Sequence, residues 1–167
     1  MLTQEQKIKI RMKKAGLPKL FEKQVERTSG IFSPKTNTTD VTKLWISGEE
    51  DARTEIAVEV LHVCAESQPV KYVNMLKIMN MSFEDLYMTF NTLSEFRGAL
   101  LLDNISRNPP PLFKSKLYAL LISRHYDNLS TICTSNIEPT DLFSIYGVEI
   151  SEHILFKYKF FKTKEIS

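Results

Sequence analysis

Residues 43–61 read KLWISGEEDARTEIAVEVL, and the choice between fold classes turns on this stretch. Its first five residues form a short apolar run that is typical of a buried strand. Gly48 then supplies a turn, and the residues from Arg53 to Glu66 repeat apolar side chains at the spacing of one helix face. A strand joined to a helix by a tight glycine turn predicts a βα unit, from which parallel sheets are built.

The rest of the chain repeats this alternation. Further strands are predicted at 70–75, 99–103 and 130–134, beside a first strand at 41–47. Helices are predicted at 3–15, 53–66, 82–95, 112–126 and 139–146. Aromatic residues and lysines alternate from Phe156 to Phe160, which predicts a half-exposed edge strand. The pattern indicates an α/β fold of three layers, with a mostly parallel five-stranded sheet.

Length and composition narrow the class of protein. The 167 residues fit one domain with a real core, and a charged fraction of 25% argues against a disordered chain. Only 5 glycines occur, which argues against collagen-like and glycine-rich architectures. Cys64 and Cys133 are too few for a disulfide framework, so we expect two reduced core residues. No secretory signal and no apolar stretch of about 20 residues is present, so we expect a cytoplasmic protein without a membrane span.

Basic residues collect at the two ends of the chain. Residues 1–28 hold eight Lys or Arg against three Glu, and they predict a basic helical arm. Residues 29–40 are rich in Ser, Thr, Asn, Gly and Pro, so we expect a linker loop before a body at 41–167. The tail from Phe156 adds four more lysines against Glu165. Such ends suit an acidic partner, although solvated charge is the equally open alternative.

The turn after the first strand lies where a phosphate-binding loop would lie. That motif, G-x-x-x-x-G-K-[ST], cradles phosphate with backbone N–H groups, a lysine and a magnesium-binding hydroxyl. With one residue deleted, Ala52, Arg53 and Thr54 fall on the G-K-[ST] positions behind Gly48. The second glycine is then missing, and residues 49–51 (EED) place three negative charges where a triphosphate would lie. We therefore expect poor ATP binding.

Polar residues also end the other predicted strands. Asp103 and Asn104 close an apolar run that looks like a Walker B strand, with an amide at the position of the second acid. Ser47-Gly48, Asp103-Asn104 and residues 134–136 all stand at carboxyl ends of strands. Ligands of parallel sheets bind beyond these ends, so the three clusters predict one site.

Read in order, the chain shows KKAGLPKLF, KLWISGEEDARTEIAVEVL, FRGALLLDNI, LYALLISRHYDNLSTICTSNIEPTDLFSIYG and VEISEHI. Over roughly residues 13–156 this arrangement resembles the ATPase domain of DnaC/DnaI-type helicase loaders and the related IstB-type ATPases. The resemblance implies a P-loop NTPase-like AAA+ core, with Asn136 as the sensor asparagine. It also implies a vestigial nucleotide site at Gly48, Arg53, Thr54, Asp103, Asn104 and Asn136.

Three features depart from this family together. Arg53 replaces the lysine, Asn104 replaces the second acid, and His153 stands where the family has an arginine that reaches a neighbouring subunit. By this resemblance we also expect the family's larger N-terminal helicase-binding domain to be reduced to the short basic arm. We therefore expect no catalytic residues, no ATP or magnesium cofactor and no hydrolysis. The expected role is to bind a replicative helicase or its loader, in a phage or mobile-element setting.

Two other functions stay open. In one, the chain is an active ATPase in which Arg53 replaces the lysine and Thr54 coordinates magnesium. In the other, it is a phage or mobile-element inhibitor that caps the ATPase ring of a host helicase loader.

Histidines and aromatic residues give weaker signals. No Cys/His pair has metal-ligand spacing, so no metal site is expected. His125 stands at a helix end, where a cation would be favourable. Phe83, Tyr87 and Phe90 share one helix face, which predicts core packing, with stacking on single-stranded DNA as the alternative.

Overall fold

Five strands form one parallel sheet in the computed structural model, which describes residues 1–21 and 43–163. Their order across the sheet is β2-β3-β4-β1-β5, and all four pairings are parallel. The strands are β1 (Lys43–Ser47), β2 (Val70–Asn74), β3 (Ala99–Ile105), β4 (Thr131–Ser135) and β5 (Lys159–Lys162). The predicted α/β fold with a parallel five-stranded sheet is therefore confirmed.

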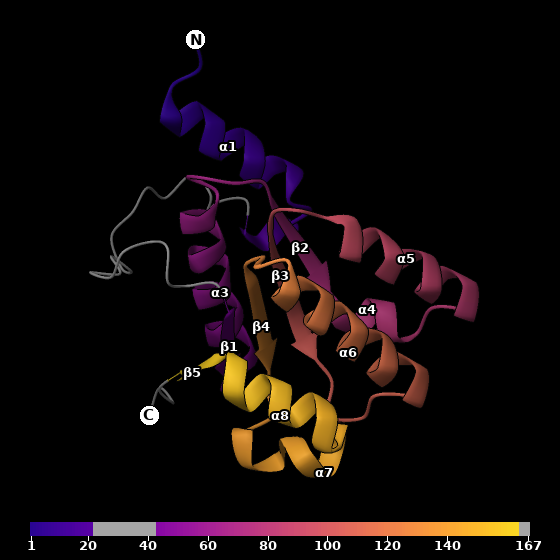
Figure 1. Ribbon diagram of the computed structural model, residues 1–167. Coiled ribbons are helices and arrows are strands. Elements are labelled where there is room, and N and C mark those ends of the chain that lie inside the picture. The colour runs from indigo at the N-terminus through magenta and orange to yellow at the C-terminus, as the bar shows by residue number, and fades with distance from the viewer. Residues whose placement is uncertain (22–42, 164–167) are drawn as a thin grey trace.

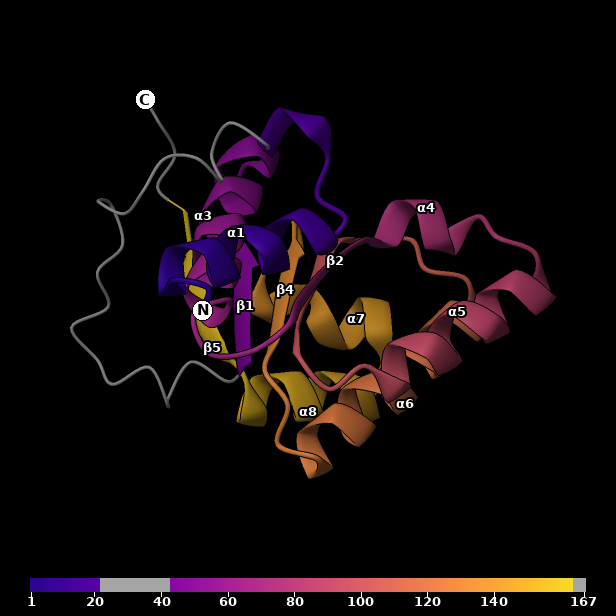
Figure 2. The same ribbon diagram turned by 90° about the horizontal axis from the view of Figure 1, so that it is seen from above.

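Helices cover both faces of this sheet (Figures 1 and 2). One layer holds α1 (Gln4–Lys14) and α3 (Glu50–Cys64). The other holds α4 (Met75–Met79), α5 (Phe83–Glu95), α6 (Pro111–Tyr126), α7 (Leu142–Tyr146) and α8 (Val148–Lys157). Two single 3-10 turns, η1 (Lys19–Phe21) and η2 (Pro139–Asp141), complete the described elements. No described helix combines the length and hydropathy that crossing a bilayer requires.

Each face of the sheet has its own hydrophobic core, because side chains alternate along a strand. In β3, Leu100 and Leu102 pack under α5 and α6, whereas Leu101 packs under α3. All seven residues of β3 are buried, as expected for a strand covered on both faces. Cys133 is buried and Cys64 half-buried, and both thiols are free.

The described part of the basic arm shares the core of the body. Thr3 caps α1 in a capping box, and Met12 and Ala15 pack against α3. Arg11 Nη1 donates to the carbonyl of Ala65 at the end of α3 (2.7 Å), so it satisfies an end carbonyl of that helix. The end of the predicted arm and the predicted linker 29–40 lie outside the described residues.

The C-terminal strand starts later than predicted. Helix α8, which the sequence patterns did not reveal, continues to Lys157, because Ile150 and Ile154 are both buried at helical spacing. Phe156 is therefore on a helix and 81% exposed, whereas Tyr158 is buried. The strand itself covers Lys159–Lys162 at the edge of the sheet.

The aromatic face of α5 is only partly buried. Phe90 packs edge-on against Phe113, with ring centroids 5.8 Å apart, as core packing predicts. Phe83 and Tyr87 are instead 64% and 46% exposed, so core packing was the wrong prediction for these two residues. Lys116 lies over the ring of Tyr87 at 4.0 Å from its centroid.

Candidate functional site at the carboxyl edge of the sheet

The turn between β1 and α3 consists of only two residues, Gly48 and Glu49. Gly48 has a φ of 120°, and a Cβ there would lie 1.9 Å from Thr163 Oγ1, so only glycine fits. The N–H of Thr163 donates to the carbonyl of Ser47 (2.9 Å), which brings the end of β5 against the turn. Helix α3 begins at Glu50 instead of the predicted Arg53, so Arg53 lies one turn into the helix.

Arg53 folds back onto this turn. Its side chain is buried, with 6% of the residue exposed. Nη1 donates to the carbonyl of Gly48 (2.7 Å) and Nη2 donates to Asn104 Oδ1 (2.7 Å). Burial lowers the pKa of Arg53, while Glu50 and Asp103 raise it. The guanidinium thus joins the end of β1 to the end of β3.

Asp103 is the centre of a second set of hydrogen bonds. It is almost fully buried and accepts from three hydroxyls: those of Thr54 (2.9 Å), Tyr72 (2.7 Å) and Thr134 (2.5 Å). Burial and the bond to Asp103 raise the pKa of Tyr72, so its phenol stays protonated and keeps donating. The carboxylate is therefore satisfied entirely by the chain's own donors.

Asn104 connects the two sets. Its φ of 61° is in the left-handed region, which asparagine tolerates better than most residues. Its N–H donates to Thr134 Oγ1 (2.9 Å), and its Oδ1 receives the bond from Arg53. Gly48, Arg53, Thr54, Asp103 and Asn104 are consequently linked in one cluster at the carboxyl ends of β1 and β3.

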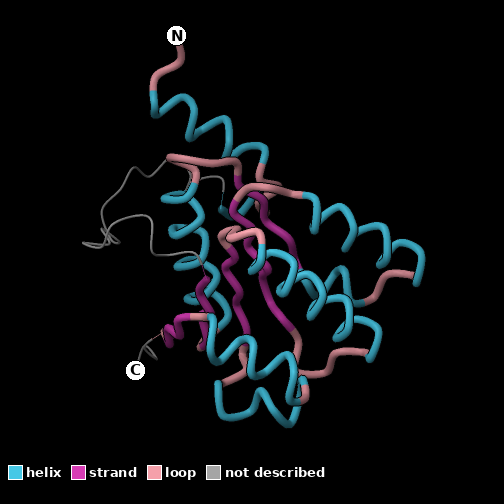
Figure 3. Tube along the Cα trace, in the orientation of Figure 1, coloured by secondary structure: helices cyan, strands magenta, loops and turns pink. Residues whose placement is uncertain are grey.

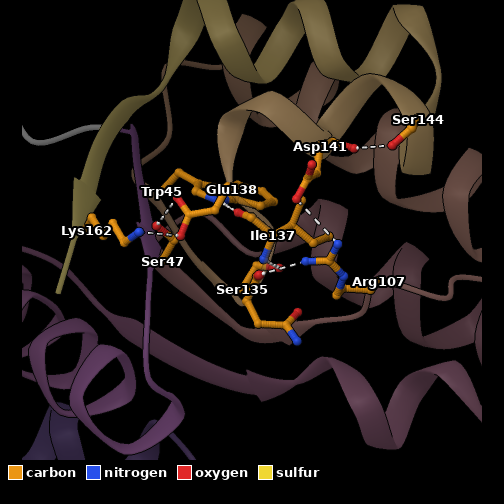
Figure 4. A network of polar contacts seen from close by, with 10 residues as sticks. Trp45, Ser47, Arg107, Ser135, Ile137, Glu138, Asp141, Ser144 and Lys162 are labelled. Atoms are coloured by element: carbon orange, nitrogen blue, oxygen red, sulfur yellow. Dashed lines mark hydrogen bonds and ion pairs between the residues drawn. The ribbon is translucent and has the colours of Figure 1, made fainter. Parts of the chain in front are cut away.

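Asn136 is separate from this cluster. It is exposed directly after β4, and its side chain makes no hydrogen bond within the described residues. Its carbonyl accepts from Arg107 Nη1 (3.2 Å), and Arg107 also pairs with Asp141 (3.4 Å; Figure 4). The structure therefore holds the backbone of Asn136 and leaves its amide free of the other predicted site residues.

Glu138 connects the neighbouring strands β1 and β5 close to this site. Its carboxylate pairs with Lys162 of β5 (3.2 Å) and accepts from the hydroxyl of Ser47 at the end of β1 (3.5 Å; Figure 4). Trp45 Nε1 donates to the carbonyl of Ile137 (3.3 Å). These contacts join the carboxyl ends of β1, β4 and β5, three neighbouring parallel strands of the sheet whose backbone is traced in Figure 3.

Tyr72, Thr134 and Thr163 belong to the site although the sequence analysis did not select them as site residues. Thr134 stood in one of the polar strand-end clusters, which was a usable signal. Tyr72 and Thr163 carried no such signal, because only the pairing of β2 with β3 and of β5 with β1 brings them here. Among the described residues, no three His, Cys, Asp or Glu side chains gather as metal ligands.

His153 packs inward. Its ring lies 5.3 Å from that of His125 on α6 and 6.1 Å from that of Tyr158. Burial lowers the pKa of His153 to about 4, with further lowering by His125, Lys157 and Lys43. Burial and the same two lysines also lower the pKa of His125, which weakens the helix-end cation expected there.

Similarity to known proteins is confined to structure. No family model matches the chain, and no curated protein matches its sequence. The crystal structure of the DnaC helicase loader superposes with a TM-score of 0.58 at 16% identity, over 78% of this chain and 82% of that one.

Two further solved structures share the fold. DnaI gives a TM-score of 0.57 at 18% identity and covers 78% of each chain. A protein named as a primosome component of Streptococcus pyogenes serotype M3 gives 0.53 at 16% identity, over 98% of this chain and 81% of that one. The chain therefore shares the overall fold of these solved structures, and the predicted α/β architecture agrees with theirs.

Proposed function

We propose that this chain is a helicase-loader-like replication protein that binds a replicative DNA helicase or its loader without hydrolysing ATP. The fold shared with DnaC and DnaI supports the helicase-loader-like role. One observation supports the proposed lack of ATP hydrolysis. The Arg53 guanidinium is bonded into the two-residue turn where the loader resemblance would place phosphate.

The surroundings of Arg53 fit a triphosphate poorly. A two-residue turn offers few backbone N–H groups, and an incoming phosphate would have to displace the bond between Arg53 and Gly48. Glu49, Glu50 and Asp51 already place negative charge at the N-terminus of α3, where the helix dipole would otherwise favour an anion. Asp103 is occupied by three hydroxyl donors, so a magnesium-bound water would have to compete with them.

Calorimetric titration with MgATP tests this part of the proposal. We expect no binding heat up to about 1 mM nucleotide, the upper end of ordinary substrate constants. Micromolar binding that disappears in Arg53→Ala would overturn the proposal and support the ATPase alternative. Arg53→Lys, which restores the family's residue, is expected to remain silent because the turn stays too short.

The exposed face of α1 is the proposed contact with the partner protein. Lys7, Lys13 and Lys14 point to solvent, while Met12 on the same helix is buried against the body. A packed helix presents these charges in a fixed arrangement, which suits an acidic patch on the partner.

Deleting the arm would also remove part of the core, so neutralised lysines make the cleaner test. Lys7→Gln with Lys13→Gln is compared with Lys77→Gln and Lys114→Gln, which carry the same charge change on α4 and α6. In pull-downs with the replicative helicase and with the loader, only the first pair should weaken binding. Failure of the full chain to bind either protein would overturn the proposal.

Helper and inhibitor differ in their effect on an active loader. Added in excess, an inhibitor that caps the ATPase ring lowers the loader's ATP turnover. A helper leaves the turnover unchanged or raises it. A dose-dependent fall in turnover would therefore support the inhibitor, and an unchanged or raised turnover would support the helper.

Single-stranded DNA is a second proposed ligand, and α5 carries the supporting observation. Phe83 and Tyr87 are exposed, with Lys116 over the ring of Tyr87. Aromatic faces beside cations stack bases without sequence preference. Anisotropy of a labelled dT oligonucleotide should rise with the chain and fall in Phe83→Ala/Tyr87→Ala. The control Tyr126→Ala removes a ring that is still more exposed, at 81%, from the end of α6, and a loss of binding there instead would contradict this assignment.

A further inference from the structure

Within the described residues, β5 is the outermost strand on one side of the sheet (Figures 1 and 2). It has the sequence KFFK, pairs with β1 alone among the described strands, and all four of its residues are exposed. The N–H of Thr163 points toward β1, where it bonds to Ser47. Backbone N–H and C=O groups point to alternate sides of a strand from one residue to the next, so those of Phe160 and Lys162 point away from β1. These groups form a short template for another strand.

The side chains of this edge are basic. Lys159 and Lys157 have no ion-pair partner among the described residues, and Lys162 pairs with Glu138. Burial and the nearby charge of Lys157 lower the pKa of Lys43 on the adjacent strand, so cations crowd this end of β1. Phe160 adds an apolar surface beside Trp45, at 6.5 Å between ring centroids. The edge therefore combines open backbone groups, unpaired cations and an aromatic ring.

We propose that the outer edge of β5 binds an extended acidic peptide segment of a partner protein by strand addition. Acidic side chains three residues apart lie opposite Lys159 and Lys162, and an apolar side chain lies opposite Phe160. Main-chain hydrogen bonds supply affinity in this mode, and the cross-strand side-chain pairs supply selectivity. The site is at the opposite end of the sheet from β2, against which α1 packs, so it is independent of the proposed contact through the arm.

Charge decides between this occupant and the alternatives. A second copy of the chain would place Lys159 opposite Lys162 if antiparallel, or each lysine opposite itself if parallel, and like charges in these positions destabilise a pair. A nucleic acid would use the lysines but not the open main-chain groups of Phe160 and Lys162. An acidic peptide uses both.

A labelled peptide containing Glu-Val-Val-Glu tests the proposal by fluorescence anisotropy with the full chain, since this sequence suits either strand direction. We expect saturable binding that weakens about tenfold in Lys159→Glu, because an attractive pair becomes a repulsive one. The matched control Lys77→Glu makes the same charge change on α4 and should leave binding unchanged. In Lys159→Glu, either Glu-Val-Val-Lys or Lys-Val-Val-Glu should restore binding, and the one that does reports the strand direction.

Backbone pairing has its own control. Methylation of the two central peptide nitrogens removes donors but keeps every charge, and it should abolish binding. Equal binding of the methylated peptide, or no effect of Lys159→Glu, would overturn the proposal. Displacement of the peptide by a dT oligonucleotide that Lys159→Glu also weakens would assign the edge to nucleic acid instead. Pull-downs with the helicase do not depend on any of these results, so the two proposals fail separately.

Discussion

Replacement of Arg53 by methionine tests whether the Arg53 guanidinium stabilises the turn between β1 and α3. Methionine keeps most of the buried volume but cannot donate, so the carbonyl of Gly48 and Oδ1 of Asn104 both lose their 2.7 Å partners. A buried polar group left unpaired costs about 1–3 kcal/mol. Part of that cost is offset because the charged guanidinium no longer has to be desolvated. Only Oδ1 of Asn104 is fully buried, whereas the carbonyl of Gly48 is half-buried, so we expect a net loss of about 1–3 kcal/mol in the free energy of unfolding.

Urea denaturation at neutral pH measures this loss, and in a chain of this size it corresponds to about 3–10 °C in Tm. The free energy of unfolding of Arg53→Lys should lie between those of the native chain and Arg53→Met, because a single ammonium group cannot donate to both acceptors as the two guanidinium nitrogens do. Lys77→Met, on an exposed lysine, is the control and should stay within about 0.5 kcal/mol of the native chain. An Arg53→Met variant as stable as the native chain would refute the reasoning, because Arg53 would then contribute no net stability.

Three further predictions concern other parts of the structure. Gly48→Ala should lower the free energy of unfolding by more than about 2 kcal/mol, because the new Cβ would lie 1.9 Å from Thr163 Oγ1 in a backbone region that alanine avoids. Urea denaturation of Gly48→Ala/Thr163→Ala should show partial recovery of stability, and no recovery would exclude the clash as a cause. The pKa of His153 is lowered to about 4 in the fold from an ordinary value of 6.5, so the unfolded chain binds the proton more readily. The contribution of His153 to the free energy of unfolding should therefore be complete above about pH 6.5 and decrease as the pH drops toward 4. In His153→Gln the free energy of unfolding should depend less steeply on pH, and an unchanged pH dependence would contradict this role of His153. Burial raises the pKa of the Cys64 thiol to about 11, so thiol reagents at pH 8 should label it much more slowly than the unfolded chain, and equal rates would contradict that burial.

Most elements of the fold followed from local pattern. The predicted strands at 70–75, 99–103 and 130–134 agree with β2, β3 and β4 to within two residues at either end. Continuous apolar runs are a strong signal because both faces of a parallel sheet are covered. Helix α6 was equally clear, since proline precedes it and an amphipathic repeat follows.

Sequence-based predictions differ from the structure where the local residue pattern favours one element and tertiary packing favours another. Phe156, Tyr158 and Phe160 alternate like a strand, yet Phe156 belongs to α8, because Ile150 and Ile154 pack into the core from the same helix. Helix α4 has only five residues, too few to show a period. The sequence pattern predicted the basic arm as a helix but not its packing, and the structure places Met12 and Ala15 in the core that also holds α3.

The amino-acid sequence by itself determined the alternation of strands and helices, the order of the strand-end clusters and the loss of the second glycine in the turn. These are properties of neighbouring residues, so periodicity and spacing reveal them. Only the tertiary structure decided what the cluster does with its charges. The parallel sheet brings together residues far apart in the chain: the pairing of β3 with β2 and β4 places Asp103 beside Tyr72 and Thr134, and the turn after β1 lets Arg53 reach Asn104. A buried guanidinium and a buried carboxylate require partners, and across that distance only the folded sheet supplies them.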